Sequence, residues 1–199
     1  MHNSKIRRLT QLGILTAIIL ILAFTPLGYI KLGPGLSVTI LHIPVIIGAC
    51  MMGPVDGMIL GAVFGATSFA QCFGLEMFGT TLFSISPFAT FITCMVPRVL
   101  FGLIAGLLFK AFSAGGAHKF AALITGALAT LCHTALFMTT LCLFFYRTDF
   151  IQNLVGQLGV TNVFAFILAF IGIGAVFEII LAALVNAALI PVLKKALNR

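Results

Sequence analysis

Charged residues are scarce in this chain. Only 8% of its 199 residues are Asp, Glu, Lys or Arg, whereas 61% are hydrophobic; a soluble globular domain has about 25% and about 45–50%, respectively. The 11 basic and 4 acidic side chains are too few to cover the surface of a water-soluble domain of this size. The composition therefore excludes a soluble enzyme or a nucleic-acid-binding domain and predicts a polytopic membrane protein.

The sequence also lacks the motifs of common catalytic and metal sites. It contains no HExxH, GxSxG or Walker A sequence, and its acidic residues are too scattered to form an evident catalytic pair. The five cysteines have no CxxC spacing, so we expect small buried hydrophobic side chains rather than a disulfide framework or a metal site. We therefore expect no catalytic residues, no cofactor and no enzymatic activity of the chain itself.

Long, continuous apolar runs make up most of the sequence, and they predict helical spans rather than the short alternating strands of a β-barrel. A hydrocarbon core of about 30 Å takes roughly 20 helical residues, so a chain of this length allows about six spans. We expect an all-α membrane protein, with six transmembrane helices in one compact domain over residues 1–199. The apolar runs are residues 9–27, 38–52, 57–72, 88–109, 121–145 and 163–192.

Basic residues divide unequally between the two ends of these spans. With six spans both termini lie on one side of the membrane, and that side carries Lys5, Arg7, Arg8, Lys110, Lys119, Lys194, Lys195 and Arg199. The other side carries Lys31 and Arg147, and Arg98 lies within a span. Because basic residues gather on cytoplasmic loops, this bias predicts cytoplasmic termini and outward-facing loops at residues 28–37, 73–87 and 146–161.

Four polar residues interrupt the apolar runs: His42, Arg98, His133 and Glu178. An ionisable group in hydrocarbon costs at least about 2.5–3.5 kcal/mol, so it normally faces a cavity or a partner. Counting about 20 residues outward from Lys110 and Lys194 places Arg98 and Glu178 ~13 Å and ~7 Å below the outer surface. His42 is shallow as well, and His133 lies near mid-membrane. This distribution predicts a ligand pocket that opens outward.

Two interpretations of Arg98 and Glu178 stay open. They form a buried structural ion pair, or Arg98 presents its planar fork of donors to a carboxylate on an anionic ligand. Pro97 frees a backbone carbonyl beside this arginine. For His42 and His133 the alternatives are a satisfied core side chain and a ligand contact. Further candidates near the outer loops are Tyr29, Gln71, Glu76, Asn153 and Asn162.

Small residues recur every four positions in several spans, a spacing that lets helix backbones approach closely. We interpret the repeats in the third and fourth spans as internal packing of the bundle; they comprise Gly57, Gly61 and Gly65, and Gly102 and Gly106. Gly13 and Ala17 form a similar pair in the first span, near its cytoplasmic end. That pair either packs internally or docks a partner.

Short motifs in the first half of the chain carry a family resemblance. Residues 41–49 read LHIPVIIGA, followed by GPVDG at 53–57 and GAVFG at 61–65, and then by Ser86-Pro87 and VPR at 96–98 with Gly102. In their order and spacing these motifs resemble the substrate-binding S-components of energy-coupling factor (ECF) transporters. HIPVIIGA and VPR are most similar to pantothenate-type members. The resemblance covers residues 9–110 by motif, and residues 117–199 by hydropathy and length alone.

The resemblance implies a six-helix subunit of the plasma membrane that captures a vitamin, here pantothenate, from outside. It also implies association with a coupling transmembrane subunit and two ATPase subunits, and a toppling motion that carries the pocket inward. Gly13 and Ala17 match the positions that contact the coupling subunit in the family, with Gly replacing the usual first Ala. The alternatives are an S-component for another vitamin or precursor, and a structural protein or channel whose buried charges pair with one another.

Overall fold

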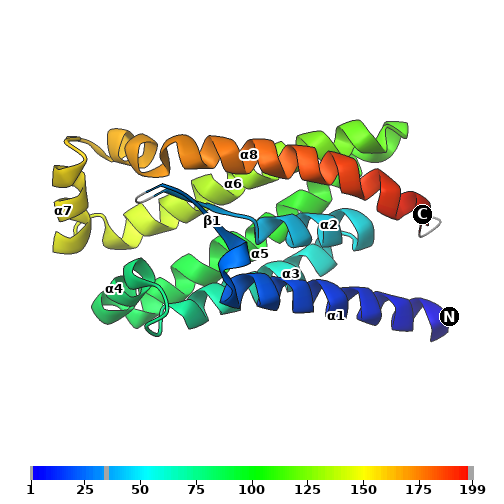
Figure 1. Cartoon of the computed structure of the whole chain (residues 1–199), viewed down its shortest axis with the longest axis horizontal. Coiled ribbons are helices and arrows are strands. Elements are labelled where there is room, and N and C mark those ends of the chain that lie inside the picture. The colour runs from blue at the N-terminus through cyan, green and yellow to red at the C-terminus, as the bar shows by residue number, and fades with distance from the viewer. Residues whose placement is uncertain (1, 34–35, 197–199) are drawn as a thin grey trace.

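The structure is a computed structural model that describes residues 2–33 and 36–196, without the side chains of residues 2–4, 29–38 and 173. It is an elongated, nearly all-helical bundle (Figure 1). The helices are α1 (His2–Phe24), α2 (His42–Met52), α3 (Pro54–Gln71), α4 (Met77–Ile85), α5 (Pro87–Phe112), α6 (His118–Phe145), α7 (Asp149–Gln157) and α8 (Val163–Ala196). Two short 3-10 turns, η1 (Pro26–Gly28) and η2 (Ser113–Gly115), complete the helical elements.

The first outer loop contains a β-hairpin that the sequence analysis did not predict. Strands β1 (Tyr29–Gly33) and β2 (Leu36–Thr39) pair antiparallel, with Tyr29 opposite Thr39 and Ile30 opposite Val38. Aromatic and β-branched residues favour strands, and the Gly/Pro composition of the segment concealed this pattern. The expectation of an all-α protein therefore holds for the bundle, whereas the segment expected to be an irregular loop is a hairpin.

The helix boundaries follow local sequence signals. α3 and α5 both begin with proline in the first turn, where the missing N–H costs nothing. The Ser86 hydroxyl accepts a hydrogen bond from the Ala89 amide and caps α5, and the Glu76 carboxylate accepts from the amides of Phe78 and Gly79 and caps α4. Such side-chain caps satisfy amides that have no partner within the helix.

Four helices of the described chain are long and apolar enough to cross a membrane: Lys5–Phe24, Pro87–Gly115, His118–Phe145 and Gly174–Ala196. α2 has 11 residues, which span only about 16 Å at 1.5 Å per residue, and α3 has 18. α8 is kinked at Gly172, whose φ is 53°, and its apolar span begins at Gly174. A count of about 20 residues back from Lys194 gives an outer boundary near residues 173–174, close to this kink. The count of six spans stays a prediction.

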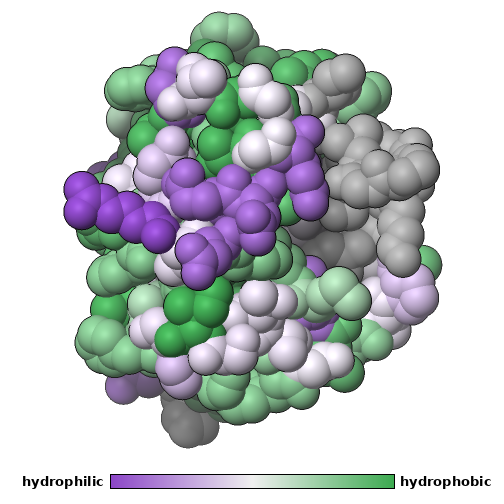
Figure 2. Space-filling view, turned by 90° about the vertical axis from the view of Figure 1, so that its left-hand side faces the viewer, coloured by the Kyte–Doolittle hydropathy of each residue, from purple (hydrophilic) through white to green (hydrophobic). Residues whose placement is uncertain are grey.

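The two ends of the bundle differ in composition. The N- and C-terminal ends of the chain lie at the same end of the molecule, and α4 and α7 lie at the opposite end (Figure 1). Figure 2 looks onto that opposite end, where hydrophilic residues gather across the middle of the face between hydrophobic ones. Gln152, Asn153 and Gln157 of α7 are exposed, whereas Ile151 and Val155 are buried. The placement of the termini in the cytoplasm stays a prediction.

α3 and α5 pack backbone to backbone in the middle of the bundle. A Cβ added to Gly57 would collide with the carbonyl of Gly102, and one added to Gly61 would collide with the carbonyl of Arg98. One added to Gly106 would collide with Pro54. These glycines therefore pack internally, as the sequence analysis predicted.

The small residues of α1 have a different environment. Apart from the chain neighbours of Gly13 and the nearby backbone of its own helix, no atom of the described chain lies within 4 Å of a Cβ built at Gly13, and both Gly13 and Ala17 are exposed. Of the two interpretations left open for this pair, internal packing does not fit the structure. Docking of a partner stays a prediction.

Candidate ligand-binding site

Arg98 is the centre of the candidate site and lies in the middle of α5, with only 8% of its surface exposed. Pro97 has no N–H to offer the carbonyl of Thr93, and Arg98 Nη1 donates to that carbonyl at 3.1 Å and to the carbonyl of Cys94 at 3.0 Å. The Pro97-Arg98 sequence thus fixes one edge of the guanidinium against its own helix. A guanidinium carries five N–H donors in a planar fork, so its geometry suits a bidentate carboxylate as well.

Aromatic rings surround this guanidinium. Its Cζ lies 5.0 Å from the ring centroid of Phe64 in α3 and 5.4 Å from that of Phe137 in α6. The imidazole of His133 lies 5.8 Å from the Phe64 ring and 5.1 Å from the Phe101 ring. Arg98 and His133 are thus brought together around one shared phenyl ring, in a site built from α3, α5 and α6.

Several buried polar atoms on the helices that carry Arg98 and His133, and on α2, are unsatisfied. His42 Nε2, Thr93 Oγ1, Thr130 Oγ1 and His133 Nε2 have no hydrogen-bond partner within the described part of the chain. Thr130 lies one helical turn from His133 on α6, and His133 lies within electrostatic range of both Arg98 and His42. A buried polar atom without a partner costs about 1–3 kcal/mol, so such a group of atoms in a native protein indicates a ligand or ordered water.

Glu178 connects this region to the hairpin. Its Oε1 accepts a hydrogen bond from the backbone amide of Thr39 at 2.7 Å, and the His42 side chain faces the backbone of Glu178. The Arg98 guanidinium is held by carbonyls of its own helix and lies against phenyl rings. Ligand binding by Arg98 and its pairing with Glu178 both stay predictions.

The weaker sequence candidates lie apart from this cluster or outside the description. Gln71 is buried at the end of α3, where its Nε2 donates to the carbonyl of Ala23 in α1. Asn162 is exposed and its side chain accepts from the Ala165 amide, as a cap of α8. Glu76 caps α4, and Asn153 is exposed on α7. The side chain of Tyr29 lies outside the described residues.

Sequence reasoning missed the threonines and phenylalanines of the site. Thr93 and Thr130 are fully buried, but a threonine in an apolar helix usually bonds its own backbone and gives no signal. Phe64, Phe101 and Phe137 are three of 20 phenylalanines, and composition cannot single them out. The positions of Thr93 and Thr130, five residues before Arg98 and three before His133, are the only hint in the sequence.

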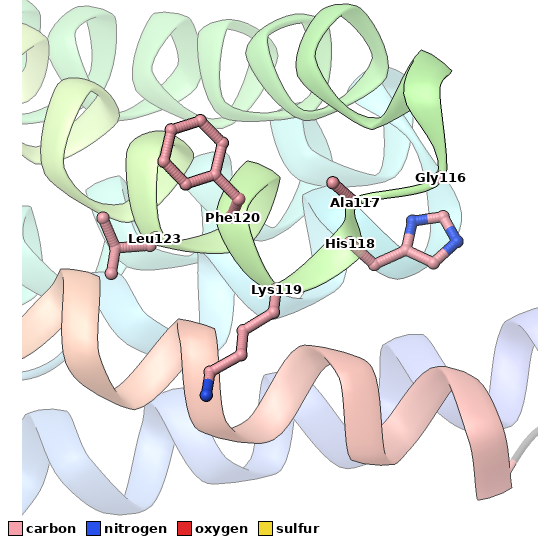
Figure 3. Close-up of a pocket in the computed structure, with 6 residues that line it drawn as sticks. All are labelled: Gly116, Ala117, His118, Lys119, Phe120 and Leu123. Carbon is pink, nitrogen blue, oxygen red and sulfur yellow. The ribbon is translucent and has the colours of Figure 1, made fainter.

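A hollow lies at the end of the molecule that carries the chain termini, at the start of α6 (Figure 3). Its volume is about 570 Å³, and it is lined by Gly116, Ala117, His118, Lys119, Phe120 and Leu123. His118 and Lys119 point in different directions (Figure 3) and do not converge on a ligand. His118 and His133 are fifteen residues apart on one helix, or about 22 Å, so this hollow is separate from the candidate site.

Comparison with known sequences assigns the family. The profile described as "ECF transporter, substrate-specific component" matches residues 7–190. The chain belongs to this family of transporter components and is therefore a multi-pass protein of the plasma membrane, as the resemblance implied.

Two curated relatives match the chain over its whole length. The pantothenic acid transporter PanT of Lactococcus lactis subsp. cremoris is 28% identical over 211 residues, which cover 100% of this chain and 99% of that protein. The pantothenate transporter PanT of Leuconostoc mesenteroides subsp. mesenteroides is 30% identical over 212 residues and covers 98% of each chain.

Proposed function

We propose that this chain captures pantothenate from outside the cell for uptake by an ECF transporter. The observation that carries the proposal is the buried Arg98 guanidinium, which shares the Phe64 ring with His133, together with the unsatisfied buried atoms of His42, Thr93, Thr130 and His133. The names of the two relatives support pantothenate among the vitamins that S-components bind.

The chemistry of pantothenate suits this set of side chains. The molecule has a carboxylate at one end, a central amide, two hydroxyls and a dimethyl group. We assign the carboxylate to Arg98, because a guanidinium binds a carboxylate bidentately. His133 and His42 meet the amide and hydroxyl groups, joined by Thr93 and Thr130. Phe64, Phe101 and Phe137 offer apolar surface to the dimethyl group.

Glu178 has an indirect part in this proposal. Its hydrogen bond to the Thr39 amide holds the base of the hairpin against α8, above the polar cluster. The pocket then opens toward the end of the bundle that carries α4 and α7. With six spans and cytoplasmic termini, that end faces outward, and the vitamin enters from outside.

Uptake itself needs partners. In this proposal the chain assembles with a coupling transmembrane subunit and two ATPase subunits, and the ATPase subunits hydrolyse the ATP. The exposure of Gly13 and Ala17 supports this face of α1 as the contact, because two small residues one turn apart let another helix approach closely.

The test is to identify the ligand directly. The chain is purified in detergent from cells grown with pantothenate, and the released small molecules are identified by mass spectrometry. Calorimetric titration of the ligand-free chain with pantothenate, riboflavin and folate follows. We expect pantothenate in the eluate and heat of binding with pantothenate alone. Another vitamin in the eluate would identify that vitamin, and not pantothenate, as the ligand. If the chain binds none of the three vitamins, a structural protein or a channel would be favoured.

A further inference from the structure

An ion pair joins α1 to α3 at the terminal end of the bundle. Arg8 Nε donates to both carboxylate oxygens of Asp56, at 2.9 and 3.0 Å, and Nη2 lies 2.7 Å from Oδ1. The Asp56 side chain is 4% exposed and the Arg8 side chain 51% exposed. Paired hydrogen bonds between a guanidinium and a carboxylate are short, strong and directional.

The two halves of α1 are held differently. Its buried residues, Ile19 and Ala23, both lie in the C-terminal half, where Gln71 also bonds the Ala23 carbonyl. In the N-terminal half, Leu12 is only partly buried against the core. The ion pair of Arg8 is therefore a directional contact in the half of α1 that otherwise packs loosely.

Helix geometry links this contact to the outward face of α1. At about 100° per residue, Leu12, Leu15 and Ile19 lie within roughly 40° of Arg8 around the helix axis. Gly13 and Ala17 lie about 140° and 180° from Arg8. When Arg8 faces Asp56, the two small residues must face away from the bundle, as observed.

We propose that Arg8 and Asp56 form a positioning pair that holds the N-terminal half of α1 against α3 and so presents Gly13 and Ala17 to the coupling subunit. The inference rests on the proposed function, because it needs that subunit. Asp56 lies in the first turn of α3, where the helix dipole stabilises a carboxylate. α3 is itself packed against α5 through its glycines, so the pair anchors α1 to the most closely packed part of the bundle.

Substitutions of Arg8 and of Asp56 differ in how much they destabilise the fold, and this difference decides which variant is used. Loss of Arg8 leaves a buried carboxylate without its partner, and such a loss is strongly destabilising. Asp56→Asn keeps the shape of the side chain and leaves an arginine that is half exposed already. Arg8→Lys keeps the charge but loses the planar fork. Lys5→Gln removes a basic residue from the same end without touching the pair, and serves as the matched control.

The first readout needs no partner protein. Because the chain contains no tryptophan, a single Leu12→Trp reports on the N-terminal half of α1, and a single Leu22→Trp on the C-terminal half. Each is placed in vesicles whose lipids carry bromine on the acyl chains, which quench tryptophan fluorescence. We expect Asp56→Asn to raise the quenching at Leu12→Trp and to leave it unchanged at Leu22→Trp. Equal quenching with and without Asp56→Asn at both reporters would overturn the inference.

The second readout is assembly with the coupling subunit in nanodiscs. We expect Asp56→Asn to weaken assembly about tenfold, equivalent to ~1.4 kcal/mol, and Arg8→Lys to weaken it less. Lys5→Gln should leave it unchanged, and pantothenate affinity should be unchanged in all three variants. The double variant Arg8→Gln, Asp56→Asn should be no worse than either single variant, since the pair acts as one unit.

The controls separate this inference from the proposed function. If Gly13→Leu weakens assembly while Asp56→Asn and Arg8→Lys do not, the coupling surface stands and the positioning pair is wrong. If neither Gly13→Leu nor Ala17→Leu affects assembly, this face of α1 is not the coupling surface, and the proposed role of the Arg8–Asp56 pair is contradicted as well. If Lys5→Gln weakens assembly as much as Asp56→Asn does, the effect comes from the net charge at this end of the chain. That result would overturn the proposal that Arg8 and Asp56 act as a positioning pair.

Discussion

The contact between α3 and α5 and the outer face of α1 share one sequence pattern but differ in structure. Gly57, Gly61 and Gly65 in α3, and Gly13 with Ala17 in α1, all place small residues one helical turn apart. At Gly61 a Cβ would strike the backbone of Arg98, whereas at Gly13 it would meet open space. The spacing alone indicates that a helix can approach closely; the structure decides whether that helix belongs to the same chain.

The contact between α3 and α5 also affects ligand binding. The carbonyl that excludes a side chain at Gly61 belongs to Arg98, the residue assigned to the ligand carboxylate. The close approach of α3 and α5 therefore fixes where the backbone of Arg98 lies relative to α3, and so holds the guanidinium next to the Phe64 ring of α3. Damage to this contact should affect folding and binding together, whereas damage to the α1 face should affect neither.

The largest effect is expected from Gly61→Ala. One methyl group in the α3–α5 contact must push two helix backbones apart, and overpacking of this kind costs typically 1–3 kcal/mol, occasionally more. We expect a strongly lowered melting temperature in detergent and loss of pantothenate binding. A variant with wild-type melting and binding would contradict the close contact between these helices.

Arg98→Lys should weaken binding without unfolding the chain. Lysine keeps the charge and loses the fork, and a hydrogen bond to a charged group is worth about 1.5–3 kcal/mol, or roughly 10- to 150-fold in affinity. Calorimetry with pantothenate and with a neutral amide analogue measures the effect. If the variant binds both compounds as the wild type does, the carboxylate assignment is wrong. A variant that fails to fold would instead favour a structural role for Arg98.

Gly13→Leu and Ala17→Leu should separate binding from transport. A bulky side chain on this exposed face would hold a docking helix away, at an overpacking cost of about 1–3 kcal/mol. Pantothenate affinity of the isolated subunit should stay near normal, because none of the residues assigned to the candidate site belongs to α1. Uptake into liposomes with labelled vitamin outside and ATP inside should fall. Unimpaired uptake by the double Leu variant would place the coupling surface elsewhere.

Gly13→Ala should have the smallest effect and is the direct counterpart of Gly61→Ala. Beyond the nearby backbone of its own helix, the added methyl group meets no atom of the described chain within 4 Å, and alanine is more favourable than glycine inside a helix by about 0.5–1 kcal/mol. We expect an unchanged or slightly raised melting temperature and normal uptake. A melting temperature lowered as far as in Gly61→Ala would show that α1 packs more tightly than the structure indicates.

The sequence predicted the helices well where local signals decide. The apolar runs at 57–72, 88–109 and 121–145 match α3, α5 and α6 to within a few residues, whereas the prolines that begin α3 and α5 were not read as helix starts. The last apolar run, 163–192, is longer than one span, and the count of about 20 residues from Lys194 that gives the depth of Glu178 also ends near the kink at Gly172. The hairpin was missed, because its glycines and proline indicated a loop more strongly than its β-branched residues indicated strands.

The site was predicted less completely, because its contacts join distant parts of the chain. Arg98 and His133 were found because an ionisable group in an apolar run is unusual. Thr93 and Thr130 became candidates only when burial left their hydroxyls without partners. The pairing of Arg8 with Asp56 links residues 48 positions apart, and the sequence alone gives Arg8 only as a basic residue before the first span and Asp56 only as part of the GPVDG motif.

Calorimetric titration with pantothenate and its neutral alcohol analogue tests the central claim most directly. The two compounds differ only in the group that we assign to Arg98. The wild-type chain should bind pantothenate more tightly by roughly 10- to 150-fold, the value of about 1.5–3 kcal/mol for a charged hydrogen bond, and Arg98→Lys should lose most of this difference. Equal binding of acid and alcohol by the wild type, or an unchanged preference in Arg98→Lys, would contradict the account.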